Sequence, residues 1–244
     1  MGHLRVQKES NKKQRTIKSI PKELLVEILA KVGTRSIVDL CMVKPCCKEF
    51  LDAAEDDHVY RHVSMENFAL VPLPWFTREK ESSFLKRCRE SGNSEIAYRE
   101  GMVQCFSSSS TLKLGLQNLK KAMLEGHHEA KYVYCMLLMC GEDEGEREEG
   151  FRLFCSLEAS TCVGRCRKRV KSFVRSVWVR NNPLLRNHNL SFCCSGTCGG
   201  ERLKKLSTRW SWPQDDEDVA SIGVSCQRCR TDHELGLFCN IFGV

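Results

Sequence analysis

Hydrophobic residues near the beginning of the chain recur at helical spacing. Pro21 suits the first position of a helix, because its fixed φ fits a helix start and its missing N–H would be unpaired there. Gly33 is expected to end this helix, since glycine adopts a left-handed cap at little steric cost. Between them, apolar residues at i, i+1, i+4, i+5 and i+8 mark one helical face, and they are Leu24, Leu25, Ile28, Leu29 and Val32.

Two further short helices are expected to follow at once. Ser36 is placed to cap the second helix, with Asp39 reaching back to it in the arrangement of a capping box. Pro45 is expected to end that helix, because its ring blocks the preceding turn. Cys47–Leu51 then begins a third helical piece. The front of the chain is therefore expected to be a unit of three short helices.

So small a unit cannot bury all of its apolar residues, and we expect a groove for another protein. Ile20–Leu29 reads Ile-Pro-x-Glu-Leu-Leu-x-Glu-Ile-Leu, Ser36–Leu40 reads Ser-Ile-x-Asp-Leu, and Cys47–Phe50 reads Cys-Lys-x-Phe. Over about 45 residues this pattern resembles the F-box. Lys44–Cys46 departs from the family pattern, at the junction of the second and third helices. The alternative is an ordinary helical hairpin buried within one larger core.

The resemblance implies a function. In the F-box family the three helices dock on the Skp-type adaptor of cullin–RING ubiquitin ligases, and a downstream domain holds a protein substrate. The chain would then be the substrate-recognition adaptor of an SCF-type ligase. It would not be an enzyme, and no serine, cysteine and histidine set has motif-like context for nucleophilic catalysis. The implied adaptor contacts, several of which must also hold the helices together, are Pro21, Leu24, Leu25, Ile28, Leu29, Val32, Ile37, Leu40 and Val43.

An internal repeat follows the F-box-like segment. Ser91–Tyr98 aligns with Glu125–Tyr132 at an offset of 34 residues, and Gly115–Leu119 echoes Gly150–Phe154 at an offset of 35. This period, with paired amphipathic helices, is typical of tetratricopeptide repeats, and its small-residue pattern resembles the Sel-type variant. Two pairs are fewer than a free-standing solenoid needs, so flanking elements are expected to cap them. Chance similarity between two amphipathic hairpins is the alternative.

Cysteines dominate the end of the chain. Cys226 and Cys229 have the two-residue spacing of a zinc-binding pair, and Cys194 and Cys198 come close to it. Zinc prefers four thiolate or imidazole ligands in a tetrahedron, commonly supplied as two close pairs. The sequence therefore predicts a structural zinc site at these four residues. The substitutes are Cys193, His233 and Cys239, and the alternative is a set of reduced cysteines in a small β-rich or irregular tail.

The composition limits the cellular compartments and the classes of partner that can be expected for this protein. A formal charge of +7 over 244 residues permits an acidic partner without demanding one. Sixteen cysteines and no visible secretory segment indicate reduced thiols in the nucleus or the cytoplasm. No apolar run reaches the ~18–20 residues that a membrane helix needs. Seven cysteines on predicted helices are expected to pack as small hydrophobic residues, and they are Cys41, Cys46, Cys88, Cys105, Cys135, Cys140 and Cys155.

Basic residues gather in two places. Residues 1–16 are expected to be a disordered basic tail, and Lys12–Arg15 could serve as a weak nuclear-import signal. Arg165–Trp178 is expected to be an amphipathic helix with a basic, solvated outer face. The alternative function is a zinc-containing nucleic-acid or chromatin-associated binding protein, which would use this helix and the cysteine-rich tail.

The expected fold is mainly α. After the tail, an F-box spans residues 17–64 and a helical-repeat domain spans 65–180. Its beginning contains a proline-rich connector in which Trp75 and Phe76 are expected to pack against a neighbour. A small cysteine-rich region, irregular or β-containing, is expected at 181–244.

Overall fold

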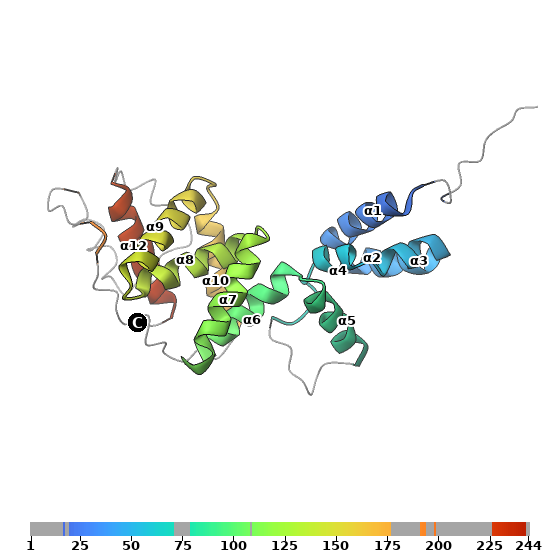
Figure 1. The fold of residues 1–244 in the computed structure, drawn as a ribbon, viewed down its shortest axis with the longest axis horizontal. Coiled ribbons are helices and arrows are strands. Elements are labelled where there is room, and N and C mark those ends of the chain that lie inside the picture. Colours follow the sequence, from blue (N-terminus) through green and yellow to red (C-terminus); the bar gives the residue numbers. More distant parts are fainter. Residues whose placement is uncertain are drawn as a thin grey trace, which may run out of the picture. The chain divides into compact units, whose positions relative to one another are not determined.

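The computed structural model describes residues 17, 20–70, 79–107, 109–176, 191–193, 198 and 226–242. These residues are mainly helical and none of them lies in a strand (Figure 1). The predicted basic tail, the connector with Trp75 and Phe76, and Cys194 lie outside the described residues. The chain divides into two compact units, one ending at Ser64 and the other beginning at Met65. Within the described ranges, no helix is both long and apolar enough to cross a bilayer.

The first unit contains four short helices. Ser36 caps the second of them as predicted, because its hydroxyl accepts a 3.1 Å hydrogen bond from the backbone N–H of Asp39. Pro45 lies in a single 3₁₀ turn that follows the end of that helix. The elements are α1 (Lys22–Arg35), α2 (Ile37–Val43), the 3₁₀ turn η2 (Lys44–Cys46), α3 (Lys48–Ala54) and α4 (Asp57–His62).

The prediction that Gly33 ends the first helix is wrong. Helix α1 continues to Arg35, and Gly33 is a buried residue within it. A Cβ atom at Gly33 would lie 3.1 Å from the Leu40 side chain and 3.4 Å from that of Val63. The glycine therefore lets α1 approach α2 and the segment after α4, and its carbonyl accepts a hydrogen bond from the N–H of Ser64.

Helix α1 lies at the centre of the first unit and packs against α2, α3 and α4. Leu29 is only 1% exposed. Burying a leucine of this kind contributes about 2 kcal/mol relative to leaving it in water. The remaining core of this unit consists of Leu25, Val26, Ala30, Ile37, Leu40, Ala53, Ala54, Val59, Tyr60 and Val63.

The second unit contains the predicted repeat. Helices α6 (Ser94–Ser107) and α7 (Leu112–Leu124) form one antiparallel pair, and α8 (His128–Cys140) and α9 (Glu144–Glu158) form the next. The first helices of the two pairs begin 34 residues apart, at Ser94 and His128. Helix α5 (Glu79–Glu90) contacts α6, and the 3₁₀ turn η3 (Ser109–Thr111) joins the first pair.

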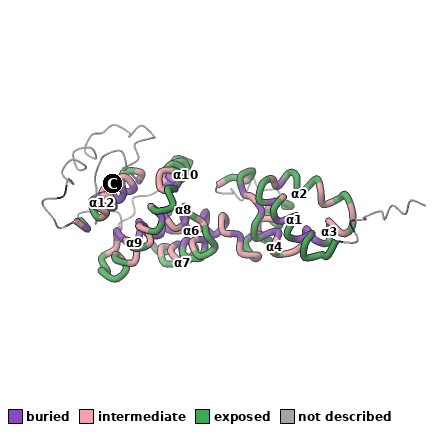
Figure 2. The backbone as a smooth tube through the Cα atoms, turned by 90° about the horizontal axis from the view of Figure 1, so that it is seen from above, coloured by how far each residue is buried: buried purple, intermediate pink, exposed green. Residues whose placement is uncertain are grey.

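Helix α8 is the most deeply buried element of the described chain, and every residue from Glu129 to Cys140 except Lys131 is buried (Figure 2). Its neighbours are α7, α9, α10 (Val163–Ser176) and α12 (Gln227–Ile241). Helix α12 corrects the expectation of an irregular or β-containing structure for residues 227–241 of the cysteine-rich region. Flanking helices thus cover the repeat pair on its C-terminal side.

The packing prediction for the seven cysteines holds for four of them. Cys88, Cys105, Cys135 and Cys140 are buried. The prediction is wrong for Cys41 and Cys46, which are exposed, and for Cys155, which is half-buried. Cys41 lies on α2 and Cys46 lies in η2, and both side chains face water in the described part of the chain.

Candidate partner-binding surface and cysteine cluster

The residues expected to contact an adaptor divide into three groups by their exposure. Pro21, Leu24 and Ile28 are exposed, and the side chains of Leu24 and Ile28 keep 55% and 47% of their surface in water. Val32 and Val43 are half-buried. The other members face the core of the first unit and hold its helices together, and they are Leu25, Leu29, Ile37 and Leu40.

The exposed group forms a stripe on α1. Leu24 and Ile28 are four residues apart on α1, so that their side chains follow one another along a single helical face, and the exposed Ile20 lies just before the helix begins. Large apolar side chains gathered on one face, with a separate core beneath, mark an interaction site more often than scattered surface residues do. The stripe is available for a partner.

Three more exposed apolar residues were missed from the sequence. Val38 and Met42 lie on α2 and Leu51 lies on α3, with exposed fractions of 54%, 68% and 46%. Val38 and Met42 are four residues apart, and this spacing could have identified a second stripe opposite the buried Ile37 and Leu40.

The 3₁₀ turn η2 (Lys44–Cys46), where the sequence departs from the F-box pattern, is connected to α4 through Glu55. The ammonium of Lys44 lies 2.6 Å from one carboxylate oxygen of Glu55, and the hydroxyl of Tyr60 donates a 2.8 Å hydrogen bond to the other. Lys44 also lies 5.6 Å from the centre of the Tyr60 ring. Glu55 thus joins η2 to α4 and orders the junction between the second and third helices.

A second candidate site lies at the beginning of α12. The sulfur atoms of Cys193, Cys198, Cys226 and Cys229 all lie within 4.8 Å of one another. Three of these are predicted ligands, and Cys193 was named as a substitute, whereas the predicted Cys194 lies outside the described residues. The Cys193 and Cys226 sulfur atoms are 4.0 Å apart, so they are not joined by a disulfide bond.

Local contacts hold the segment that carries Cys193 against α12. The carboxylate of Asp232 accepts hydrogen bonds from the N–H groups of Phe192 and Cys193, at 2.8 and 3.1 Å, and from the hydroxyl of Ser191 at 2.6 Å. The buried Phe192 ring stacks on Phe151 of α9 with 5.5 Å between centroids. One residue of α12 therefore orients a thiol that lies about 40 positions earlier in the chain.

The beginning of α12 determines the positions of Cys226 and Cys229. Cys226 is the residue before the first turn of α12, and Cys229 lies within that turn. The backbone N–H of Cys229 lowers the pKa of the Cys226 thiol to about 7 from its ordinary 9.0, and a hydrogen bond with Cys198 acts in the same direction. A thiol with a lowered pKa is more readily deprotonated, which is the form that binds metals.

The other proposed substitutes do not join this cluster. His233 lies on α12 with its Nδ1 atom buried and without a hydrogen-bond partner in the described part of the chain. Burial lowers the pKa of this imidazole, so the neutral form is favoured. Cys239 is buried further along α12 beside Cys140 of α8.

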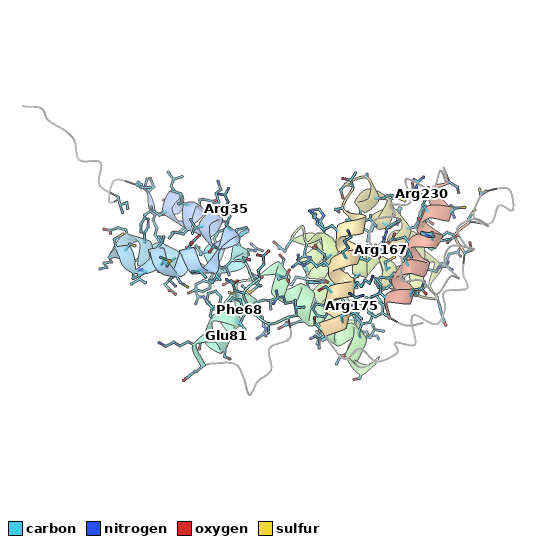
Figure 3. The ribbon with its side chains drawn as sticks, turned by 180° about the vertical axis from the view of Figure 1, so that it is seen from behind. Arg35, Phe68, Glu81, Arg167, Arg175 and Arg230 are labelled. Carbon is cyan, nitrogen blue, oxygen red and sulfur yellow. The ribbon has the colours of Figure 1, made fainter. Side chains whose placement is uncertain are left out.

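The basic helix expected at Arg165–Trp178 corresponds to α10, whose buried face carries Cys166, Val170 and Phe173. Its outer face is only partly solvated. Arg167 points to α12 (Figure 3) and binds the Glu234 carboxylate at 2.9 and 2.6 Å, while Arg169 lies 2.6 Å from Glu95. Since these guanidinium groups already face carboxylates, less of the helix is free to contact phosphates than the sequence suggests.

Known proteins match both units. A family model described as plant tetratrico peptide repeats matches residues 68–175. The chain is 29% identical to Putative F-box protein At1g67623 of Arabidopsis thaliana over 231 residues, which are 91% of this chain and 76% of that protein. It is 30% identical to F-box protein At2g35280 of the same plant over 142 residues, which are 58% of this chain and 83% of that protein.

A third Arabidopsis relative, F-box protein At1g67340, is 27% identical over 136 residues, covering 55% of this chain and 35% of its own length. No solved structure matches the chain. Three observations indicate the same family. They are the exposed apolar residues on a small helical unit, the pairs of helices that repeat after 34 residues, and the F-box relatives. The chain belongs to the plant F-box proteins that carry tetratricopeptide-like repeats.

Proposed function

We propose that this protein is the substrate-recognition subunit of an SCF-type cullin–RING ubiquitin ligase. The first unit would dock on the Skp-type adaptor, and the repeat unit would hold a protein destined for ubiquitination. The observation that carries the proposal is the apolar surface of Leu24 and Ile28 on α1, with Ile20 just before the helix, which stays exposed although the first unit has a core of its own. Its role requires a nuclear or cytoplasmic location, and no catalytic step is assigned to the chain.

We propose an adaptor interface that uses a different set of residues from the one the sequence implies. Buried anchors in the centre of an interface dominate binding, and only exposed side chains can become such anchors. We therefore assign the contact to Leu24 and Ile28 of α1 with Val38 and Met42 of α2. Leu25 and Leu29 support the interface from beneath.

Capture of a purified Skp-type adaptor by the full-length chain tests this assignment. The double substitution Leu24→Ser with Ile28→Ser should abolish capture while the circular dichroism spectrum and the melting temperature stay close to those of the wild type. The matched control is Leu114→Ser with Leu124→Ser, which replaces two exposed leucines of the second unit and should leave capture intact. Retained capture by the folded Leu24 and Ile28 variant would defeat the assignment.

The alternative of a nucleic-acid or chromatin-associated protein has weaker support. Its main basis is the basic face of α10, and Arg167 and Arg169 on that helix are engaged by Glu234 and by Glu95. Binding to a random DNA duplex that weakens steeply with added salt would favour this alternative.

We also propose that the four clustered thiols hold a structural zinc ion. In a tetrahedral site with Zn–S bonds of about 2.3 Å, neighbouring sulfur atoms are about 3.8 Å apart. The 4.0 Å separation of Cys193 and Cys226 is close to this value. Zinc would join the 191–198 segment to the beginning of α12, adding to the hydrogen bonds that Asp232 supplies.

Elemental analysis of the purified chain should find about one zinc ion per molecule. Cys226→Ser with Cys229→Ser should remove it and lower the melting temperature, whereas Cys41→Ser with Cys46→Ser replaces two exposed thiols outside the cluster and should retain it. A metal-free protein that takes up no zinc when supplied with it would refute the site.

A further inference from the structure

The first helices of the two repeats are covered by the chain itself. Arg169 of α10 lies 2.6 Å from Glu95 on α6. The hydroxyl of Tyr132 on α8 donates a 2.7 Å hydrogen bond to the carboxylate of Glu234 on α12. Among the residues of α6 and α8 whose burial is described, only His128 is exposed. An outside protein therefore finds few side chains to contact on these two helices.

Helix α7, the second helix of the first repeat, carries the exposed large apolar residues of the described part of the second unit. Leu114 and Leu124 keep 49% and 73% of their surface in water. Gln117 and Lys121, both exposed, lie between the two leucines at spacings of three and four residues, which places all four side chains on one face of the helix. The aliphatic stem of Lys121 adds to the apolar area. These four residues, the α7 surface, extend over about 15 Å along the helix.

The α7 surface lies away from the core of the second unit. The buried residues of α7 are Gly115, Leu119 and Ala122, and the Leu119 side chain is fully buried. Neither Leu114 nor Leu124 belongs to the apolar cluster that these residues join. Their exposure to water is unfavourable, and the packing of the repeat does not require it. Substitutions on the α7 surface should therefore leave the fold intact.

Lysines flank the α7 surface. Lys113, Lys120 and Lys121 are exposed, and α7 contains no acidic residue. Neither Lys113 nor Lys121 forms an ion pair with any residue that the structure describes. The second helix of the next repeat has the opposite charge at its beginning, where Glu144 and Glu146 of α9 are exposed. An acidic partner would therefore be attracted to α7 and repelled from the beginning of α9.

We propose that the α7 surface binds an acidic, amphipathic segment of the protein substrate. Two apolar side chains of that segment cover Leu114 and Leu124, and its carboxylates face Lys113 and Lys121. The inference rests on the proposed function, because it names the surface and the chemistry by which the repeat unit recognises its substrate. Two apolar side chains about 15 Å apart lie about ten residues apart in a helical segment or about four apart in an extended one.

Peptide selection on the full-length protein tests the proposal. The bait is the variant Leu24→Ser with Ile28→Ser, so that the adaptor surface selects no binders of its own. A random peptide library should yield binders that combine aspartate or glutamate with two apolar residues at one of these spacings. The wild type should bind a selected synthetic peptide equally well. Binders without an acidic preference would overturn the proposal.

Two substitutions on α7 then test the apolar contacts. Leu114→Ser with Leu124→Ser should weaken the binding of the selected peptide by at least about tenfold, because its apolar residues lose their contacts. The melting temperature should stay close to that of the wild type, because both leucines lie outside the core. A peptide that binds this variant as tightly as the wild type would overturn the assignment to α7.

A charge exchange tests the lysines. Lys113→Glu with Lys121→Glu should weaken the peptide by about tenfold, and a peptide with lysines in place of its acidic residues should recover binding to this variant. Lys80→Glu with Lys86→Glu makes the same charge change at exposed positions of α5 and should bind the original peptide normally. Equal loss in both charge variants would overturn the proposal, because it would indicate general attraction rather than a site.

Adaptor capture by the same α7 variants separates this inference from the proposed function. Loss of peptide binding with intact capture of the Skp-type adaptor supports both. A wild-type chain that binds the acidic peptide through α7 but captures no adaptor would refute the ligase assignment and not the α7 surface.

Discussion

Gly115 of α7 lies against Cys105 of α6 so closely that a Cβ atom on the glycine would stand 2.7 Å from the cysteine backbone nitrogen. Gly150 of α9, at the equivalent place in the next repeat, would put a Cβ atom 2.8 Å from the carbonyl oxygen of Cys135 in α8. Backbone atoms cannot move aside as side chains do. The two glycines therefore set how closely the helices of each pair can pack.

Gly115→Ala and Gly150→Ala should each destabilise the repeat unit by about 2–3 kcal/mol, because the added methyl group forces the paired helices apart. In an exposed helix the same change would stabilise by about 1 kcal/mol. Urea denaturation followed by circular dichroism measures the difference. Gly145→Ala is the control, since its Cβ atom would meet only the Asp143 side chain. Unchanged stability in the first two variants would show that the pairs do not depend on this close approach.

The buried and exposed leucines of α1 should behave differently. Leu29→Ala should lower the free energy of unfolding by about 3 kcal/mol, through lost burial and the cavity that remains. Leu24→Ala removes a side chain that is more than half exposed. This substitution should change the free energy of unfolding by about 0.5 kcal/mol or less. The measurement is the urea midpoint of the full-length chain. Similar losses in the two variants would mean that Leu24 is covered in solution.

Acid should weaken the network around Glu95. Burial by itself raises the pKa of this carboxyl, but the hydrogen bond from His127 and the charge of Arg169 outweigh burial and lower it to about 2 from 4.5. His127 accepts the Ala130 N–H at Nδ1, so its proton lies on Nε2 and is donated to Glu95 at 2.8 Å. Stability from this group is present above pH 4.5 and is lost as the pH falls toward 2.

Glu95→Gln should therefore cost about 2–3 kcal/mol at pH 7, and the gap to the wild type should close between about pH 5 and pH 2. Thermal melting at a series of pH values measures this gap. Glu148→Gln, at an exposed position of α9, provides the comparison and should run parallel to the wild type. A gap for Glu95→Gln that is independent of pH would contradict the assigned ionisation.

Glu234→Gln tests the docking of α12. The amide keeps an acceptor for the Tyr132 hydroxyl but removes the charge that faces Arg167, whose side chain is 20% exposed. Breaking one partner of a largely buried ion pair should cost about 3 kcal/mol. Differential scanning calorimetry of the full-length protein should show the loss, together with faster hydrogen exchange in α12. A melting temperature equal to that of the wild type would indicate that α12 is held by its apolar contacts.

Local signals made the first unit largely predictable. The Ser36 cap and the break at Pro45 depend on neighbouring residues, and both are found in the structure. Gly33 was misassigned because its role depends on Leu40 and Val63, which reach it from other elements. Adjacent leucines such as Leu24 and Leu25 are alike in the sequence, and only the packing of α3 and α4 decides which of them is buried.

In the second unit, too, local sequence signals were predictive and contacts between distant residues were not. The period of the repeat can be recognised from individual residues such as Gly115 and Gly150, and this period predicted the paired helices. Helix α12 escaped prediction because its buried face contains Glu234, whose burial depends on Tyr132 and Arg167 far away in the sequence. The place of Cys193 in the sulfur cluster likewise depends on the Asp232 carboxylate, which accepts a hydrogen bond from its backbone N–H across 39 residues of the sequence.

The contact of Tyr132 with Glu234 spans 102 residues, and this distance delays the maturation of the repeat during synthesis. At a translation rate of about 5–20 residues per second, α8 emerges roughly 5–20 seconds before the helix that covers it. Until then the most apolar of the described helices has one side open to solvent. Newly made chains should be vulnerable to aggregation and attractive to chaperones throughout that interval.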